Sequence, residues 1–334
     1  MKKKYQNAFF MFGIAVLIIM VTQLDFKEVY EGLQRAGYWF FAVIALWFFL
    51  YILNTASWYT IIHHSQKTGE KRDKQVEFWW LYKITVSGFA LNYATPGGLM
   101  GGEPYRIMSL SPKIGTERAS SSVILYAMTH IFSHFWFWLL SAMLYVAIEN
   151  VTIPMLCFII ALTAFCSLAI WFFIKGYKRG ITVNCMQVLS RFPMIKKWAN
   201  PFFEKHSEQL KNIDRQIAIL HNQNRKAFVI AVLLELMCRI ISALEIYFIL
   251  LVLSPKANYL ESILILAFTP LIANMLFFLP LQLGGREGGF LMSAKGLALT
   301  ANAGIFVALI VRLRELIWTA IGLMLIKLDR KKEN

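Results

Sequence analysis

Residues 92–106 read NYATPGGLMGGEPYR and interrupt one hydrophobic stretch, and residues 279–289 read LPLQLGGREGG and interrupt another in the second half of the chain. In each, a glutamate follows a proline by seven residues (103 − 96 and 287 − 280), with glycines between them. The two pairs are Pro96 with Glu103 and Pro280 with Glu287. Glycine and proline interrupt helical hydrogen bonding, which a bilayer tolerates only where the backbone is buried in protein or lines a polar cavity. Matched interruptions in the two halves of a membrane chain are typical of a transport site.

The composition is that of a membrane protein. Of the 334 residues, 58% are hydrophobic and only 16% are charged, whereas about a quarter of a typical soluble chain is charged. The apolar residues form long runs, so we expect an all-α polytopic membrane protein with a single integral membrane domain over residues 1–334. The net charge of +15 does not indicate a nucleic-acid partner, because no recognition motif accompanies it and the basic residues gather between the hydrophobic runs.

The charges of the loops predict how the chain crosses the membrane. Basic loops lie on the cytoplasmic side, so both termini and the loops at 63–77, 111–118 and 175–226 are expected inside. About six full spans follow, at 8–24, 38–62, 120–148, 151–174, 227–253 and 304–326. The first is expected to be an uncleaved span, because no small-residue cleavage site follows it.

The two interrupted stretches do not fit as simple spans. Residues 78–110 have cytoplasmic loops on both sides, which predicts a re-entrant helical hairpin that enters and leaves from the inside. Residues 260–303 begin and end outside, which predicts a second hairpin from the opposite face. Two opposed hairpins with matched motifs predict an inverted repeat. If residues 111–118 lay outside, the first stretch would instead be a full span.

The long polar segment 175–226 is strongly basic, with eleven lysines and arginines against three acidic residues. Its apolar residues recur at helical spacing, which predicts amphipathic helices on the cytoplasmic membrane surface. A partner-binding segment is the alternative interpretation.

The first interruption has the features of an anion site. Glu103 and Pro104 predict a helix start, because proline is favoured at the first helical position. The glycines before it let backbone N–H groups approach a ligand, and a helix N-terminus attracts anions such as phosphate. Arg106 lies on the same side of that helix and can bind a phosphate through two hydrogen bonds. Arg286 can do the same in the second interruption. The alternative is that the glutamates only cap the helices or pair with arginine to hold irregular backbone.

These arguments, with one arginine of the last span, define a predicted substrate-binding set. Its members are Asn92, Pro96, Gly97, Gly98, Gly101, Gly102, Glu103, Arg106, Pro280, Gly284, Gly285, Arg286, Glu287 and Arg312. Other charges at membrane depth are Glu235, Arg239, Glu245, Arg314 and Glu315. Glu235 and Arg239 are four residues apart on one helix, so they are expected to neutralise each other.

Few other patterns indicate chemistry. The chain has no nucleotide-binding motif, and we predict no cofactor, metal or catalytic residue. The four cysteines form no C-x-x-C pair and are expected to be small buried residues. His130 and His134 have the spacing of a helical metal pair, but no carboxylate completes a zincin-type motif, which favours a packing or interfacial role.

At these residues the chain resembles a flippase-like integral membrane family related to the transmembrane (flippase) region of lysylphosphatidylglycerol synthase. One shared pattern is N…P…GE…R…L, here Asn92, Pro96, Gly102, Glu103, Arg106 and Leu110. The others are P…GG…E, here Pro280, Gly284, Gly285 and Glu287, and the arginine at 312. The chain departs from the family at Thr129, His130, Ser133 and His134, where members often carry acidic and basic residues.

The resemblance implies a protein of the bacterial cytoplasmic (inner) membrane. It also implies movement of an anionic, aminoacylated or polyprenyl-phosphate-linked lipid between leaflets. Membrane lipids are then its partners, and a homo-oligomer or a membrane partner is left open. Synthase activity is not expected, because only a short tail follows Ile326.

Two other functions fit the pattern. One is an intramembrane lipid-modifying enzyme that uses Glu103 or Glu287 as an acid or base. The other is a non-catalytic membrane subunit that docks a partner on residues 175–226.

Overall fold

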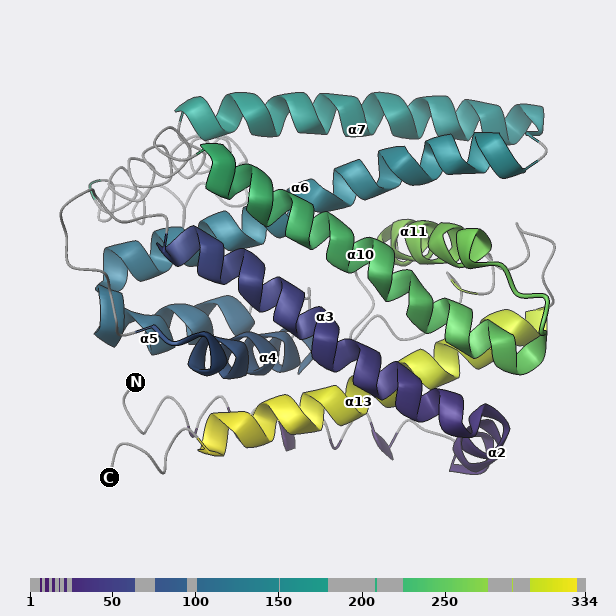
Figure 1. Cartoon of the computed structure of the whole chain (residues 1–334), viewed down its shortest axis with the longest axis horizontal. Coiled ribbons are helices and arrows are strands. Elements are labelled where there is room, and N and C mark those ends of the chain that lie inside the picture. The colour runs from purple at the N-terminus through teal and green to yellow at the C-terminus, as the bar shows by residue number, and fades with distance from the viewer. Residues whose placement is uncertain are drawn as a thin grey trace, which may run out of the picture.

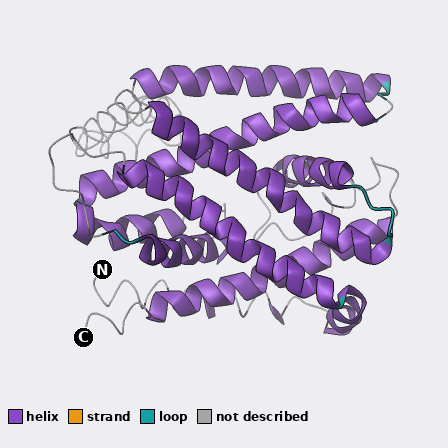
Figure 2. Cartoon of the chain, viewed as in Figure 1, coloured by secondary structure: helices purple, strands orange, loops and turns teal. Residues whose placement is uncertain are grey.

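The computed structural model describes residues 26–63, 76–94, 101–149, 151–179, 225–275 and 301–328, with a few isolated positions elsewhere. Every regular element in these ranges is an α-helix (Figure 2). In chain order they are α2 (Phe26–Ala36), α3 (Tyr38–His63), α4 (Phe78–Ala94), α5 (Gly102–Ile114), α6 (Thr116–Ile148), α7 (Ile153–Arg179), α10 (Arg225–Leu253), α11 (Tyr259–Met275) and α13 (Ala301–Leu328).

Four of these helices are long and apolar enough to cross a membrane, since a span needs about 20 residues. The qualifying segments are Tyr38–His63, Thr116–Ile148, Ile153–Lys175 and Lys226–Leu253. A polytopic all-α membrane protein is therefore confirmed. The four segments contain or nearly match the predicted spans 38–62, 120–148, 151–174 and 227–253. The 28-residue α13 contains the predicted span 304–326, whereas span 8–24 and most of segment 175–226 lie outside the described residues.

The described residues of the hydrophobic stretch 78–110 form two short helices. α4 has 17 residues and α5 has 13, so at 1.5 Å per residue they are about 26 and 20 Å long, against a hydrocarbon core of about 30 Å. Both lie in the left half of Figure 1, and α5 leads through Gly115 into α6 at that end. The 17-residue α11 lies in the right half instead.

Close backbone contact holds α4 against α5. A side chain at Gly102 would overlap the backbone carbonyl of Gly88, so the two helices approach at glycine on both sides. Asn92 near the end of α4 accepts a hydrogen bond of 2.7 Å from the Gly102 N–H. This bond provides a partner for one of the first N–H groups of α5, which have none within the helix.

α13 packs against the other side of α4. The Ser87 hydroxyl donates a 2.9 Å hydrogen bond to the Gly322 carbonyl, and a Cβ at Gly322 would lie 2.9 Å from the Val86 oxygen. The last long helix therefore supports the short helix that carries the first motif.

Replacing Gly322 with leucine is expected to separate α13 from α4, because the new side chain has no room beside the Val86 backbone. Overpacking of this kind costs about 1–3 kcal/mol. Thermal unfolding of the purified protein in detergent will measure the loss. Met324 on the same helix is exposed, so Met324→Leu is the matched control. Equal unfolding temperatures for Gly322→Leu and the control would contradict this packing.

α7 lies at the edge of the bundle (Figure 1) and exposes an apolar face. Ile160 and Leu168 are 60% and 64% exposed, as expected for a helix that faces lipid. Cys166 and Cys238 are buried as predicted, whereas Cys157 lies on the exposed side of α7. The buried core lies between α3, α6, α10 and α13, and that core contains the polar residues described next.

Candidate functional site

A cavity of about 280 Å³ lies inside the bundle, between α3, α4, α6, α10, α11 and α13. Part of its wall is aromatic, with Trp47, Phe89, Phe137 and Trp138. The histidines and charged residues of the wall are His130, His134, Glu235, Arg239, Glu245 and Arg314. Charged side chains at membrane depth are costly and usually face a bundle interior or an aqueous cavity, so this cavity is the candidate functional site.

α10 supplies a polar stripe along the cavity. Glu235, Arg239, Ser242 and Glu245 all line it. Their spacings of four, three and three residues bring them to one face of a helix. Over ten residues the stripe extends for about 15 Å, which is about half the hydrocarbon thickness.

The Glu245–Arg314 ion pair closes one end of this stripe. Arg314 donates from Nε and Nη2 to the two carboxylate oxygens of Glu245, at 2.8 and 3.0 Å. Trp47 Nε1 donates a third bond of 2.9 Å to Glu245, and the Arg314 guanidinium lies 3.8 Å from the Trp47 ring centre. Both charged side chains are only 2% exposed. Such a two-bond geometry offsets the desolvation of a buried pair.

One guanidinium nitrogen of Arg314 does not take part in these hydrogen bonds. Its Nη1 has no hydrogen-bond partner among the described protein atoms, although it is buried. Nη2 also lies 3.7 Å from a Glu315 carboxylate oxygen. A buried donor without a partner is costly, so Nη1 is available to a ligand in the cavity.

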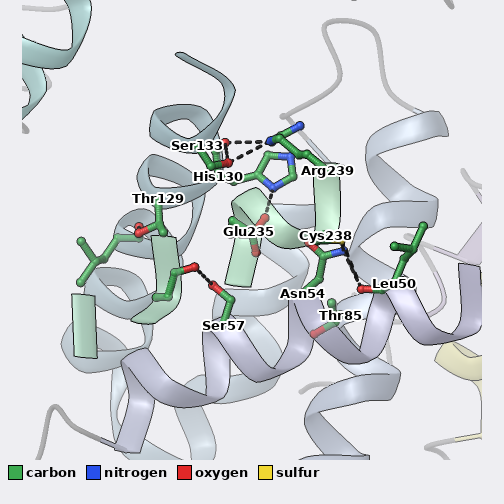
Figure 3. Close-up of polar contacts among 12 residues, drawn as sticks. Leu50, Asn54, Ser57, Thr85, Thr129, His130, Ser133, Glu235, Cys238 and Arg239 are labelled. Atoms are coloured by element: carbon green, nitrogen blue, oxygen red, sulfur yellow. Dashed lines mark hydrogen bonds and ion pairs between the residues drawn. The ribbon is translucent and has the colours of Figure 1, made fainter. Parts of the chain in front are cut away.

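The other end of the stripe bonds to α6 (Figure 3). His130 Nδ1 lies 2.7 Å from Glu235 Oε2. Arg239 donates to the Ser133 hydroxyl at 2.9 Å and to the His130 carbonyl at 2.8 Å. Glu235 and Arg239 thus make these hydrogen bonds to α6 and not to each other, while their opposite charges still attract, as the helical spacing predicted. His130 has a more specific role than packing, since it binds a buried carboxylate at the cavity wall.

The first motif forms a clamp at the back of this cavity. Arg106 Nη1 and Asn92 Nδ2 both donate to Glu103 Oε1, each at 3.1 Å. Arg106 Nη2 donates to the Thr85 carbonyl at 3.3 Å, which ties α5 to α4. The clamp therefore matches the structural alternative, in which Glu103 and Arg106 hold irregular backbone, and their contact with a phosphate stays a prediction.

Aromatic rings surround Arg106. Its guanidinium lies 4.6 Å from the ring centre of Phe89 and 5.4 Å from that of Tyr126, and the side chain is 2% exposed. Phe89 also lines the cavity, so one side chain contacts both Arg106 and the cavity. Gly88 makes the arrangement possible, because a Cβ there would overlap Arg106 Nε.

The structure brings together only part of the predicted substrate-binding set. Hydrogen bonds link Asn92, Gly102, Glu103 and Arg106, and the buried Gly101 directly precedes Gly102. Arg312 is half-buried, and Arg314 lines the cavity in its place. The remaining members lie outside the described residues: Pro96, Gly97, Gly98, Pro280, Gly284, Gly285, Arg286 and Glu287.

The cavity residues of α10 were absent from that set, although their signal is in the sequence. Charged or polar residues at 235, 239, 242 and 245 give a helical stripe inside an otherwise apolar span. A stripe of this kind, rather than each charge singly, indicates a polar pathway.

Membrane-length helices around a charged cavity define a polytopic membrane protein with a polar interior. A family model described as "Lysylphosphatidylglycerol synthase TM region" matches residues 8–322, and the chain belongs to this family. The resemblance that the motifs indicated is therefore confirmed, and it connects the chain with a lipid-related function. The match is to the membrane part of the synthase, whose catalytic part is a separate domain. Searches of curated proteins and of solved structures found no match.

Proposed function

We propose that this protein moves a lipid with a phosphate-bearing headgroup between the leaflets of the bacterial inner membrane. The observation that carries the proposal is the cavity lined by Arg239 and Arg314 inside a bundle of apolar helices. Arginine binds phosphate through two parallel hydrogen bonds, and intramembrane charge marks a substrate pathway more often than a structural site. The headgroup occupies the cavity while the acyl chains stay in the bilayer.

In this proposal the polar stripe of α10 guides the headgroup. Its phosphate competes with the Glu245 carboxylate for Arg314, whose Nη1 has no described protein partner. Arg239 is the second cation along the same helix face. The three classes of lipid in question, anionic, aminoacylated and polyprenyl-phosphate-linked, all carry a phosphate that these arginines can bind.

We also propose the complete topology, with six full spans, both termini in the cytoplasm and two re-entrant hairpins related as an inverted repeat. Support comes from the short α4 and α5 in one half of the bundle and the short α11 in the other. In such transporters the site lies near the midplane between the repeats. Accessibility scanning of single cysteines at 111–118 will test the first hairpin, and labelling from the outside would contradict it.

Leaflet exchange in reconstituted vesicles tests the function directly. The assay follows phosphatidylglycerol with a fluorescent acyl chain, and protein-free vesicles are the control. Faster exchange with protein than without it is expected. Mass spectrometry of the same vesicles tests the intramembrane enzyme, because a covalent change in the lipid would favour that function over transport.

Arg106→Ala is expected to lower the exchange rate, because it releases α5 from α4 and opens the back of the cavity. Losing hydrogen bonds between charged groups costs about 1.5–3 kcal/mol. The structural clamp predicts that the unfolding temperature falls with the rate, whereas a direct phosphate contact predicts loss of exchange at normal stability. Arg35→Ala, on an exposed part of α2, is the control. Full exchange by both Arg106→Ala and Arg286→Ala would contradict the motif-based site.

A further inference from the structure

The pair of Glu235 and His130 has the geometry of a proton-binding site. The carboxylate on α10 is 1% exposed, and its Oε2 lies 2.7 Å from His130 Nδ1 on α6. Glu235 Oε1 is buried without a hydrogen-bond partner among the described protein atoms. The imidazole is 27% exposed and lines the cavity. Because the imidazole is exposed to the cavity, protons can reach this pair from there. Histidine is also the side chain whose charge changes most readily near neutral pH.

Other charges near the pair occur in ion pairs. Arg314 pairs with Glu245 and also lies 3.7 Å from Glu315, and Arg106 pairs with Glu103 beside Phe89. Arg239 is different, because its hydrogen bonds go to the neutral Ser133 hydroxyl and His130 carbonyl. The other titratable groups that face the pair are Tyr126 and His134 on α6 and Cys238 on α10.

The protonation of the pair decides whether Arg239 has a counter-charge. With a neutral imidazole that donates Nδ1–H to the carboxylate, the pair carries one negative charge, which balances Arg239. One further proton makes the pair neutral, and Arg239 is then an unbalanced cation in a region of low dielectric constant. Unbalanced charge is unfavourable there, and an anion in the cavity supplies the missing negative charge.

We infer that Glu235 and His130 bind a proton that is taken up together with a phosphate-bearing lipid headgroup at Arg239. The inference rests on the proposed function and names the ion coupled to it. Coupling between two ligands is reciprocal, so the anion strengthens proton binding as much as the proton strengthens anion binding. A proton that accompanies the headgroup links lipid movement to the transmembrane proton gradient.

Proton uptake on lipid binding tests the inference without a transport assay. The purified protein, in weakly buffered detergent solution at neutral pH with a pH-indicator dye, is titrated with short-chain phosphatidylglycerol. Wild-type protein is expected to take up about one proton per bound lipid. Its affinity for phosphatidylglycerol is expected to fall by up to about tenfold for each pH unit above neutrality. Phosphatidylcholine of the same chain length controls for micelle effects.

Two variants are expected to change lipid affinity in opposite directions. Glu235→Gln leaves Arg239 without a counter-charge, so the variant binds lipid with high affinity at every pH and takes up no proton. His130→Gln leaves the carboxylate charged, so it binds weakly at every pH, also without proton uptake. A merely structural pair would give weaker binding in both variants. Glu31→Gln, on the exposed surface of α2, is the control.

The outcomes separate this inference from the proposed function. Lipid binding by wild-type protein without proton uptake overturns the coupling and leaves the lipid site standing. Proton uptake that persists in both variants overturns the assignment to Glu235 and His130. Absence of lipid binding by wild-type protein overturns the proposed function and the inference with it.

Discussion

Arg314→Met is expected to abolish lipid exchange and to destabilise the protein. The change removes both hydrogen bonds from Arg314 to Glu245. The Glu245 carboxylate stays buried and keeps the hydrogen bond from the Trp47 N–H. Breaking a buried ion pair from one side costs about 3–5 kcal/mol. Exchange of fluorescent phosphatidylglycerol and thermal unfolding of the same preparation measure the two effects.

A double variant separates these effects. Replacing both partners of a buried pair by hydrophobic residues is often neutral or stabilising, so Glu245→Leu with Arg314→Met is expected to recover the stability lost by the single change. It lacks the arginine that we propose to bind the headgroup phosphate, and the loss of charged hydrogen bonds corresponds to roughly tenfold to hundredfold weaker binding. A stable double variant that exchanges lipid at the wild-type rate would show that Arg314 is only structural.

The sequence predicts the long helices well, because their boundaries depend on local signals. The span predicted at 227–253 lies within α10, and that at 38–62 lies within α3. In the stretch 78–110, α4 ends at Ala94 and α5 begins at Gly102, on either side of the glycine-rich interruption, but α5 extends through Pro112 to Ile114. Pro112 lies inside α5, near its C-terminal end, and does not stop the helix. The composition alone therefore does not locate the end of α5.

The partners of the buried charges are much harder to predict. Arg312 and Arg314 are two residues apart, so at about 100° per residue they point to nearly opposite sides of α13. Only the packing of α13 decides that 314 faces the cavity. Glu245 and Arg314 are 69 residues apart, and His130 and Glu235 are 105 apart. Helical spacing within α10 predicts only that Glu235 lies near Arg239. It cannot predict which residues of α6 these two side chains contact.

Gly102→Val is expected to disrupt the first hairpin and, with it, lipid exchange. Any Cβ at this position meets the Gly88 carbonyl, which is backbone and cannot rotate away, and would lie 2.7 Å from the Asn92 side-chain oxygen. The cost combines overpacking, about 1–3 kcal/mol, with the loss of the hydrogen bond from the Gly102 N–H to Asn92, about 0.5–1.5 kcal/mol. The effect reaches the cavity because Asn92, Glu103 and Arg106 form one hydrogen-bonded clamp.

The unfolding temperature and the rate of lipid exchange should therefore both be lower in Gly102→Val than in the wild-type protein. Thr116→Ala, at the exposed start of α6 just beyond α5, controls for general effects of substitution in this region. Gly88→Ala tests the same contact from α4, where a new Cβ would meet Arg106 Nε, a side-chain atom. Because a side chain can move and a backbone carbonyl cannot, Gly88→Ala should cost less than Gly102→Val. The reverse order would mean that the position of Arg106, rather than the contact between the two helix backbones, determines the stability of the hairpin.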